Sequence, residues 1–151
     1  MRPAAQGDVA AVIAMQDRIF PGDPTRPSDE EFQARAQARD PYLTVVDVDG
    51  EVAGLFVLRD RAYRPWTSVD FFGVDDRFRG RGLAHVMMPA LFANARRPIV
   101  RLFVRPSNGA ARRVYAAHGL RHVSTRQASY PDGEDAMVLM RWIGAGFTPP
   151  R

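Results

Sequence analysis

The segment from Val69 to Leu83 combines residue types that could hold a phosphate group. It reads V-D-F-F-G-V-D-D-R-F-R-G-R-G-L, so an apolar run stops at Val74 and arginines then alternate with glycines. This pattern predicts a strand, a turn and the start of a helix. Free backbone N–H groups and the helix dipole favour an anion at such a start, and glycine lets that anion come close. Arginines add charge and paired donors. The segment therefore predicts a pyrophosphate site, although R-x-x-G-x-G alone also fits an ordinary strand-to-helix connection.

The residues before this segment predict two helices joined by a loop. Asp8 stands at an N-cap position for a helix over 9–20, whose apolar residues recur at helical spacing. The breaker-rich stretch 21–27 predicts a loop, and Ser28 with Glu31 forms a capping-box pattern that starts a helix to about Ala38. Little room is left for a strand before the first helix. We expect these helices and their loop to border the entrance of a binding site.

A hairpin is the strongest local signal in the chain. Two β-rich runs, 42–48 and 51–59, flank Asp49-Gly50, a dipeptide that favours a two-residue turn. The helix that begins near Leu83 should continue to about Ala95. Pro89 within it predicts either a kink or an irregular turn.

The remaining sequence predicts three strands and one short helix. A strand over 99–104 precedes a helix capped by Ser107 or Asn108 and ended by Gly119. Strands over about 120–127 and 136–143 follow, separated by a turn-rich segment. Strands that alternate with helices imply parallel pairing in the middle of the sheet, whereas the hairpins are antiparallel. We expect one domain over residues 1–151 with a mixed sheet.

Composition excludes several classes of protein. The chain of 151 residues has no cysteine, which removes disulfide frameworks, thiolate metal sites and a cysteine nucleophile. Neither a membrane-spanning run nor a signal-peptide core is present, so we expect a soluble cytoplasmic protein. The formal charge is +4 and all 21 basic residues are arginine. Because they are dispersed without an aromatic-interleaved run, we do not expect nucleic-acid binding.

Two spaced motifs resemble those of the GNAT superfamily of N-acetyltransferases. Val74-x-x-Arg77-x-x-Gly80-x-Gly82-Leu83 is similar to its acetyl-CoA-binding motif. The second motif, V-x-x-x-N-x-x-A-x-x-x-Y-x-x-x-G-L over 104–120, is similar to the one that follows it in the same superfamily. The resemblance covers nearly the whole chain. It implies an α/β (α+β) fold with a mixed, mostly antiparallel sheet of about six or seven strands flanked by about four helices.

The resemblance also implies an acetyl-CoA site and no metal. Backbone amides from Arg79 to Ala84 would hold the pyrophosphate, and the main chain at Phe72 and Val74 would pair with the pantetheine arm. Asn108 would contact the pantetheine side, and Tyr115 would protonate the departing CoA thiolate. The residues expected to bind acetyl-CoA are Phe72, Val74, Arg77, Arg79, Gly80, Arg81, Gly82, Leu83, Ala84, Asn108 and Ala111.

Some of these residues also have a purely structural interpretation. Asn108 is explained as an N-cap, and Tyr115 could be a core aromatic. The attacking amine must be neutral, which requires a base or a water relay. Asp70 is the candidate base because it shares strand parity with Phe72 and Val74 unless a bulge intervenes; a solvated carboxylate is the alternative.

The acceptor has several possible classes. Tyr130 lies in a Y-P-D-G-E-D-A segment that resembles the loop of protein N-terminal (RimI-like) acetyltransferases, where a tyrosine holds the peptide N-terminus. Phe20 belongs to a helix-loop-helix similar to theirs, whereas Ser129 departs from their usual second tyrosine. The alternatives are an acetyltransferase for small amines such as amino acids, polyamines or antibiotics, a non-catalytic CoA-binding domain, and a basic nucleic-acid-binding module. We expect a monomer or a homodimer.

Overall fold

The structure of the chain is a computed structural model that describes residues 1–22 and 26–144. Residues 23–25 of the predicted loop lie outside this range. The chain divides into two compact units, which we describe separately. The first contains Met1–Arg59 and Asp70–Asn94, and the second contains Asp60–Val69 and Ala95–Arg151. The strands form a seven-stranded sheet in the order β1-β2-β3-β4-β5-β7-β6, in which β4 and β5 run parallel and β1–β2, β2–β3, β5–β7 and β6–β7 pair antiparallel. The predicted fold class is confirmed.

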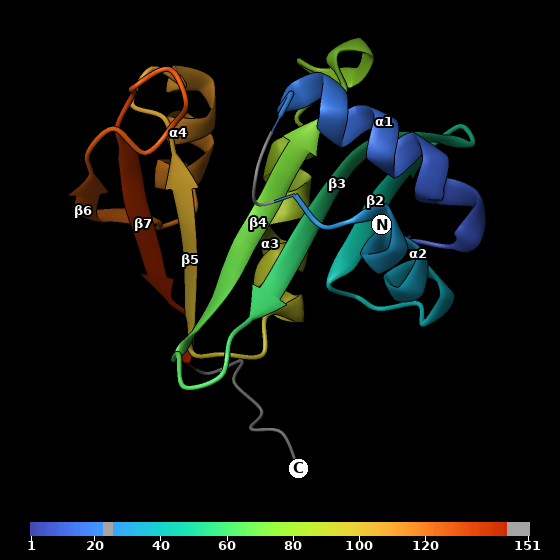
Figure 1. The fold of residues 1–151 in the computed structure, drawn as a ribbon, viewed down its shortest axis with the longest axis horizontal. Coiled ribbons are helices and arrows are strands. Elements are labelled where there is room, and N and C mark those ends of the chain that lie inside the picture. Colours follow the sequence, from blue (N-terminus) through green and yellow to red (C-terminus); the bar gives the residue numbers. More distant parts are fainter. Residues whose placement is uncertain (23–25, 145–151) are drawn as a thin grey trace. The chain divides into compact units, whose positions relative to one another are not determined.

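The first unit holds most of the N-terminal half of the fold (Figure 1). Its elements are β1 (Arg2–Pro3), α1 (Val9–Ile19), α2 (Asp29–Gln37), β2 (Leu43–Val48), β3 (Glu51–Asp60), the end of β4 (Trp66–Val74) and α3 (Leu83–Asn94). The predicted hairpin is confirmed, with Asp49 at φ 52° and Gly50 at φ 82°. Positive φ at both central residues is the type I′ geometry, whose twist matches that of the strands it joins.

The start of the chain differs from the sequence-based prediction at two points. Arg2 and Pro3 form the short strand β1, which pairs antiparallel with β2 and is too short to leave a sequence pattern. Asp8 occupies the predicted N-cap position of α1, but its side chain makes no capping hydrogen bond to that helix. Its Oδ2 instead accepts hydrogen bonds from the Ala5 N–H at 2.7 Å and from Arg2 Nη1 at 2.6 Å. A 3₁₀ turn over Gln6–Asp8 precedes α1 and turns the carboxylate back along the chain.

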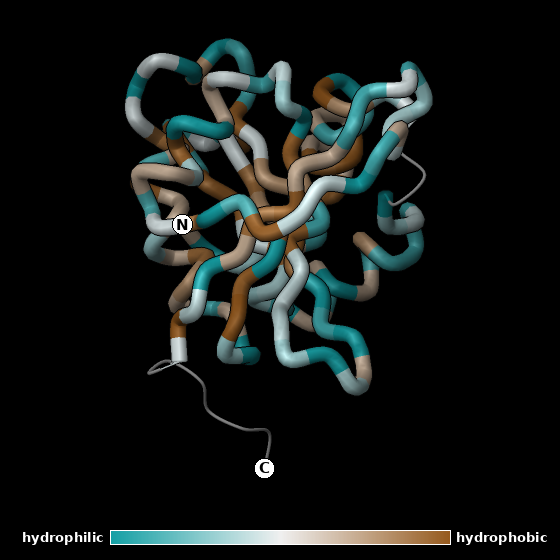
Figure 2. The backbone as a smooth tube through the Cα atoms, turned by 90° about the vertical axis from the view of Figure 1, so that its left-hand side faces the viewer, coloured by the Kyte–Doolittle hydropathy of each residue, from teal (hydrophilic) through white to brown (hydrophobic). Residues whose placement is uncertain are grey.

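Helices cover both faces of the sheet in the first unit (Figure 1). One face packs against α1 and α2 in a cluster of buried side chains that includes Val12, Met15, Phe32, Leu55 and Phe71. Figure 2 colours the backbone by hydropathy, and brown hydrophobic segments alternate with teal hydrophilic ones along the chain. Burial of apolar surface is the main stabilising contribution, at about 25 cal/mol per Å².

On the other face, α3 buries Met87, Met88 and Leu91 completely. A Cβ atom on Gly54 of β3 would lie 3.0 Å from the sulfur of Met87, so glycine at this position lets the helix approach the strand closely. The helix continues through Pro89 to Asn94, as the sequence predicted.

The second unit is built around the later strands. It contains the start of β4, then β5 (Ile99–Val104), α4 (Gly109–Ala117), β6 (Arg121–Arg126) and β7 (Ala136–Trp142). Strand β4 runs parallel to β5, and β7 pairs antiparallel with both β5 and β6. Every residue of β6 is exposed, as fits a strand with one hydrogen-bonded neighbour at the end of the sheet.

The ends of α4 are fixed by the residues that the sequence indicated. The Asn108 side-chain oxygen accepts a hydrogen bond from the Ala111 N–H at 3.2 Å, so Asn108 rather than Ser107 is the N-cap. Gly119 has a φ of 78° and ends the helix, with the Leu120 N–H donating back to the Tyr115 carbonyl at 3.0 Å. These caps determine where Tyr115 lies relative to β5.

Candidate active site

The predicted phosphate turn leads from β4 into α3 in the first unit. A 3₁₀ turn over Asp76–Phe78 is followed by Gly80 at φ 78° and Gly82 at φ 76°, and α3 begins at Leu83. A Cβ atom added to either glycine would meet no atom within 4 Å. The space beside the turn is therefore open, and the left-handed backbone at both positions favours glycine. This is the geometry that a ligand needs to approach the N-terminus of a helix.

The three arginines of this turn are held in different ways. Arg77 pairs with Asp75 at 3.2 Å and with Glu51 at 3.4 Å. Arg79 pairs with Asp76 at 2.9 Å and donates to the Val74 carbonyl at 3.3 Å. The Arg81 guanidinium lies 5.1 Å from the centre of the Phe78 ring. All three guanidinium groups are thus gathered at the turn, and Arg77 and Arg79 would have to share or exchange carboxylate partners to bind a phosphate.

Asp75 anchors the turn, and the sequence analysis did not identify it. Its carboxylate accepts from the Arg77 N–H at 3.0 Å and forms an ion pair with Arg18 of α1, while its side chain is only 3% exposed. Burial of the Asp75 carboxyl opposes its ionisation, yet the Arg77 N–H and the guanidinium groups of Arg77 and Arg18 together lower its pKa below the ordinary value. An acidic residue directly after a strand and before a 3₁₀ turn is the signal that could have found it.

We expect Asp75→Asn to lower the free energy of unfolding by about 1–3 kcal/mol at pH 7, because it weakens a buried hydrogen-bonded carboxylate. A depressed pKa in the folded state contributes stability that is present above the unfolded pKa, near 4, and is lost as pH falls through the folded value. Urea unfolding of the wild-type and Asp75→Asn proteins should therefore differ at neutral pH and converge in acid. Asp76→Asn, at a side chain that is 70% exposed, is the control. An equal loss in both variants would contradict the assigned role.

Asp70, the candidate base, is already engaged in an ion-pair network. Its Oδ2 accepts from Arg59 Nε at 2.7 Å, and Arg59 also donates to Glu31 of α2 at 2.9 Å. Its neighbour Phe71 is buried in the α1 and α2 cluster. The Asp70 carboxylate thus binds Arg59, whose guanidinium also reaches Glu31 of α2. This ion pair gives Asp70 a structural role, and its role as the base stays a prediction.

The other first-unit residues of the expected site lie close to these elements. Phe72 and Val74 are half-buried near the end of β4. Phe20, expected to contact the acceptor, packs edge-to-face on Phe71 with ring centres 5.6 Å apart. The half-buried Leu83 and Ala84 open α3.

In the second unit, Tyr115 lies on the buried side of α4. Its side chain is 6% exposed, while Ala111 one turn earlier is half-buried. Burial raises the pKa of Tyr115, and the neighbouring Tyr130 adds to this increase. The phenol therefore stays protonated throughout the neutral range. Tyr115 and Tyr130, predicted separately as a proton donor and an acceptor contact, are brought into electrostatic contact.

The loop that carries Tyr130 is fixed to the start of α4. The Arg105 guanidinium lies 3.9 Å from the centre of the Tyr130 ring and pairs with Asp132 at 2.8 Å and Glu134 at 3.0 Å. Glu134 also accepts from the N–H and the hydroxyl of Ser107, both at 2.9 Å. This carboxylate–guanidinium network sets the position of Tyr130. Arg105 was not among the residues that the sequence patterns indicated.

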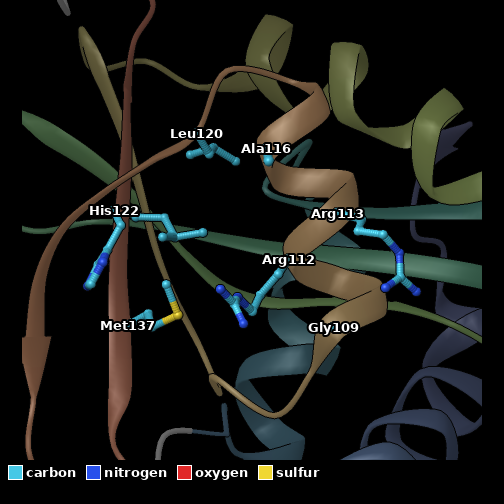
Figure 3. Close-up of a pocket in the computed structure, with 8 residues that line it drawn as sticks. Gly109, Arg112, Arg113, Ala116, Leu120, His122 and Met137 are labelled. Atoms are coloured by element: carbon cyan, nitrogen blue, oxygen red, sulfur yellow. The ribbon is translucent and has the colours of Figure 1, made fainter.

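A separate pocket of about 430 Å³ lies between α4, β6 and β7 (Figure 3). It has an apolar floor that includes Met137 and Leu139, and Arg112 and His122 line it. In Figure 3 Arg112 and Arg113 extend from opposite sides of α4. None of the residues predicted to bind acetyl-CoA or the acceptor lines this pocket.

A comparison with known protein families identifies the chain. The model of the Acetyltransferase (GNAT) family matches residues 9–120, which span both motifs. The chain belongs to this family. It is an acetyltransferase, and the resemblance expected from the sequence is confirmed.

Individual proteins are similar to the chain in sequence or in fold. The chain is 27% identical over 111 residues, 74% of this chain and 76% of the relative, to a 5-NmdU N-acetyltransferase of Pseudomonas phage PaMx11. Its fold resembles that of the ribosomal-protein-S18-alanine N-acetyltransferase from Escherichia coli, with 20% identity, a TM-score of 0.72, and 94% and 92% of the two chains covered. It also resembles Arabidopsis thaliana NAA60 in complex with acetyl-CoA, with 20% identity, a TM-score of 0.73, and 94% and 98% covered.

Over 1–22 and 26–144, the helices are all too short or too polar to cross a bilayer. The same residues contain no group of three or more histidine, aspartate or glutamate side chains arranged to hold a metal ion.

Proposed function

We propose that this acetyltransferase moves an acetyl group from acetyl-CoA directly to the primary amine of an acceptor. The observation that carries the proposal is the open turn at Gly80 and Gly82, where left-handed glycines precede the N-terminus of α3. Such a turn suits the pyrophosphate of acetyl-CoA, because backbone N–H groups and the helix dipole both favour it. The acetyl-CoA complex of NAA60, which has a similar fold, supports the same ligand.

The remaining roles follow the family motifs. We propose that the main chain at Phe72 and Val74 binds the pantetheine arm and that Asn108 contacts the same arm beside its capping role. We also propose that residues 1–151 form a single acetyltransferase domain. The family match across 9–120 supports this, because it includes parts of both units.

The chemistry needs no covalent intermediate with the protein. A neutral amine nitrogen attacks the thioester carbonyl, a C–N bond forms, and the C–S bond then breaks. The nitrogen loses one proton, and the sulfur leaves as a thiolate that must gain one. We assign the second transfer to Tyr115, whose raised pKa keeps the phenol proton available for the thiolate. The phenolate then recovers its proton from solvent or from the proton released by the amine.

Asp70 is the proposed acceptor of the amine proton, directly or through water. Under this proposal Asp70→Asn lowers kcat by about 10²-fold or more and changes the pH–rate profile, because general-base contributions are typically this large. Steady-state kinetics across pH with wild-type and variant enzyme measure the effect.

The control for Asp70 is Glu31→Gln, which weakens the same ion-pair network at the opposite side of Arg59. If the network matters only for structure, both variants lose similar activity and keep the wild-type pH profile. That result would remove Asp70 from the mechanism and leave it as an anchor for α2.

The acceptor class is proposed as a peptide or protein N-terminus. Tyr130 and the network through Arg105 support it, since they build an ordered loop in the segment that resembles RimI-like enzymes. Small amines are the second candidate. Similar proteins differ in their acceptors, since one is named a ribosomal-protein-S18-alanine N-acetyltransferase and another a 5-NmdU N-acetyltransferase. A screen with acetyl-CoA, comparing short peptides of varied first residue with polyamines, aminoglycosides and amino acids, decides between them. No acetylation of any peptide would contradict the peptide assignment.

A further inference from the structure

Arginine and aromatic side chains alternate across one face of the strands in the second unit. The guanidinium of Arg64 lies 5.3 Å from the ring centre of Trp66, and that of Arg101 lies 4.6 Å from the same centre. Arg101 also lies 4.8 Å from the ring centre of Phe103, and Arg126 lies 5.0 Å from the same centre. We call these five residues the arginine–aromatic ladder.

Strand register places the four strand residues of the ladder on the face opposite α4, and Arg64, which precedes β4, lies near the Trp66 ring. Arg101 and Phe103 alternate along β5 with the buried residues Leu102 and Val104. Leu102 and Val104 pair with Leu139 and Met137, which line the pocket beneath α4. Side chains on alternate residues point to opposite faces, so the strand residues of the ladder and α4 lie on different sides of these strands. Arg64 and Arg126 are exposed, and the Phe103 side chain is 41% exposed.

The positive charge of the ladder is not neutralised within the described residues. Over 1–22 and 26–144, Arg64, Arg101 and Arg126 form no ion pair, whereas the nearby Arg105 has two carboxylate partners. The side-chain N–H groups Arg101 Nε and Trp66 Nε1 are buried and have no hydrogen-bond partner in the same residues. Burial and the fields of Arg126 and Arg64 lower the pKa of Arg101. A ligand with negative charge and acceptor oxygens would stabilise this cluster.

We propose that the arginine–aromatic ladder binds single-stranded nucleic acid. Phosphates would neutralise the three arginines, while bases would stack on Phe103 and on the guanidinium planes. An acidic peptide would neutralise the charge but would leave the aromatic faces unused. A second copy is disfavoured because two-fold pairing would bring the same cationic face against itself.

This proposal reverses the expectation drawn from the sequence. The ladder residues occupy positions 64, 66, 101, 103 and 126, so they look dispersed along the chain. Pairing of β4 with β5, and of β5 and β6 with β7, brings them onto one face. The proposal does not rest on acetyl transfer, because binding can be measured without acetyl-CoA.

The test is fluorescence anisotropy with labelled twelve-nucleotide strands of oligo(dT) and oligo(U), titrated at several salt concentrations. With three phosphates neutralised, log K should fall against log salt with a slope of about −2. Arg64→Glu and Arg126→Glu should each weaken binding about tenfold or more and flatten this slope. Phe103→Leu, which keeps an apolar side chain but removes the ring, should weaken binding by about five- to a hundredfold, the range for loss of one stacked base.

The matched control is Arg113→Glu, an equal charge change on the exposed side of α4. It should leave the affinity close to that of the wild type. Equal weakening by Arg113→Glu and Arg126→Glu would show attraction by net charge alone and overturn the proposal. Three other results would also overturn the proposal. One is unchanged oligonucleotide binding in Phe103→Leu. The others are that inorganic polyphosphate binds as tightly as the oligonucleotides, or that dTMP binds as tightly as oligo(dT). A preference for either oligo(dT) or oligo(U) would support the site and show whether it binds DNA or RNA.

Discussion

Replacing Tyr115 with phenylalanine should lower kcat by about 10²- to 10³-fold while leaving the affinity for acetyl-CoA unchanged. The phenol is the proposed proton donor to the thiolate, and a positioned acid typically contributes this much to a rate. Phenylalanine keeps the buried ring of a side chain that is 6% exposed, so packing of α4 should persist. Release of free CoA thiol, measured under saturating acetyl-CoA and acceptor, gives kcat, and calorimetry gives the affinity.

Tyr42→Phe is the matched control, because Tyr42 is buried to a similar extent, at 5% exposed, but lies in the first unit before β2. It should leave kcat unchanged. A Tyr115→Phe enzyme with wild-type kcat would assign the protonation step to another group or to water. A weakened affinity for acetyl-CoA without a change in kcat would make Tyr115 a binding residue.

The same tyrosine should affect stability at alkaline pH. Its pKa is raised in the folded state, so folding favours the neutral phenol. The resulting stability is fully present below the unfolded pKa, near 10, and is lost as pH rises toward the folded value. The free energy of unfolding of Tyr115→Phe should therefore fall less steeply than that of the wild type above about pH 10.

Gly82→Trp should reduce the affinity for acetyl-CoA by at least about a hundredfold. The open space next to Gly82 would receive the indole ring, which would exclude the pyrophosphate from the N-terminus of α3. A φ of 76° adds backbone strain of about 1–3 kcal/mol for any residue other than glycine. Isothermal titration of acetyl-CoA into wild-type and variant protein measures the change.

Gly50→Trp separates strain from obstruction. Gly50 has a φ of 82° and equally open surroundings, but it lies in the β2–β3 turn. Both variants should lose similar stability in thermal unfolding, and Gly82→Trp alone should lose acetyl-CoA affinity. Equal affinities in the two variants would place the pyrophosphate elsewhere.

Local sequence signals predicted those elements whose conformation depends on neighbouring residues. The Asp49-Gly50 turn, the Asn108 cap and the glycines before α3 each need a particular backbone, and few residue types permit it. Asp8 takes the predicted N-cap position of α1, but its ion pair with Arg2 was not predictable, because Arg2 lies in a strand of two residues that no periodic pattern reveals.

Features that depend on distant residues were not predictable in this way. Asp75 is held partly by Arg18, 57 residues earlier, and Asp70 is held by Arg59 of the adjacent strand. The arginine–aromatic ladder likewise exists only once strand order and register are known. A single sequence gives residue types and local spacing, whereas these contacts follow from which strands pair and which faces pack.

The central claim is transfer of acetyl from acetyl-CoA to an amine, and one measurement tests it most directly. Purified protein is incubated with isotope-labelled acetyl-CoA and the acceptor panel, and both labelled acetamide products and free CoA are quantified by mass spectrometry. We predict one acceptor class that gains label in equal amount to the CoA released, at a rate that falls about 10²-fold or more in Tyr115→Phe. Tight binding of acetyl-CoA, with CoA release no faster than in Tyr115→Phe for every acceptor tested, would contradict this account.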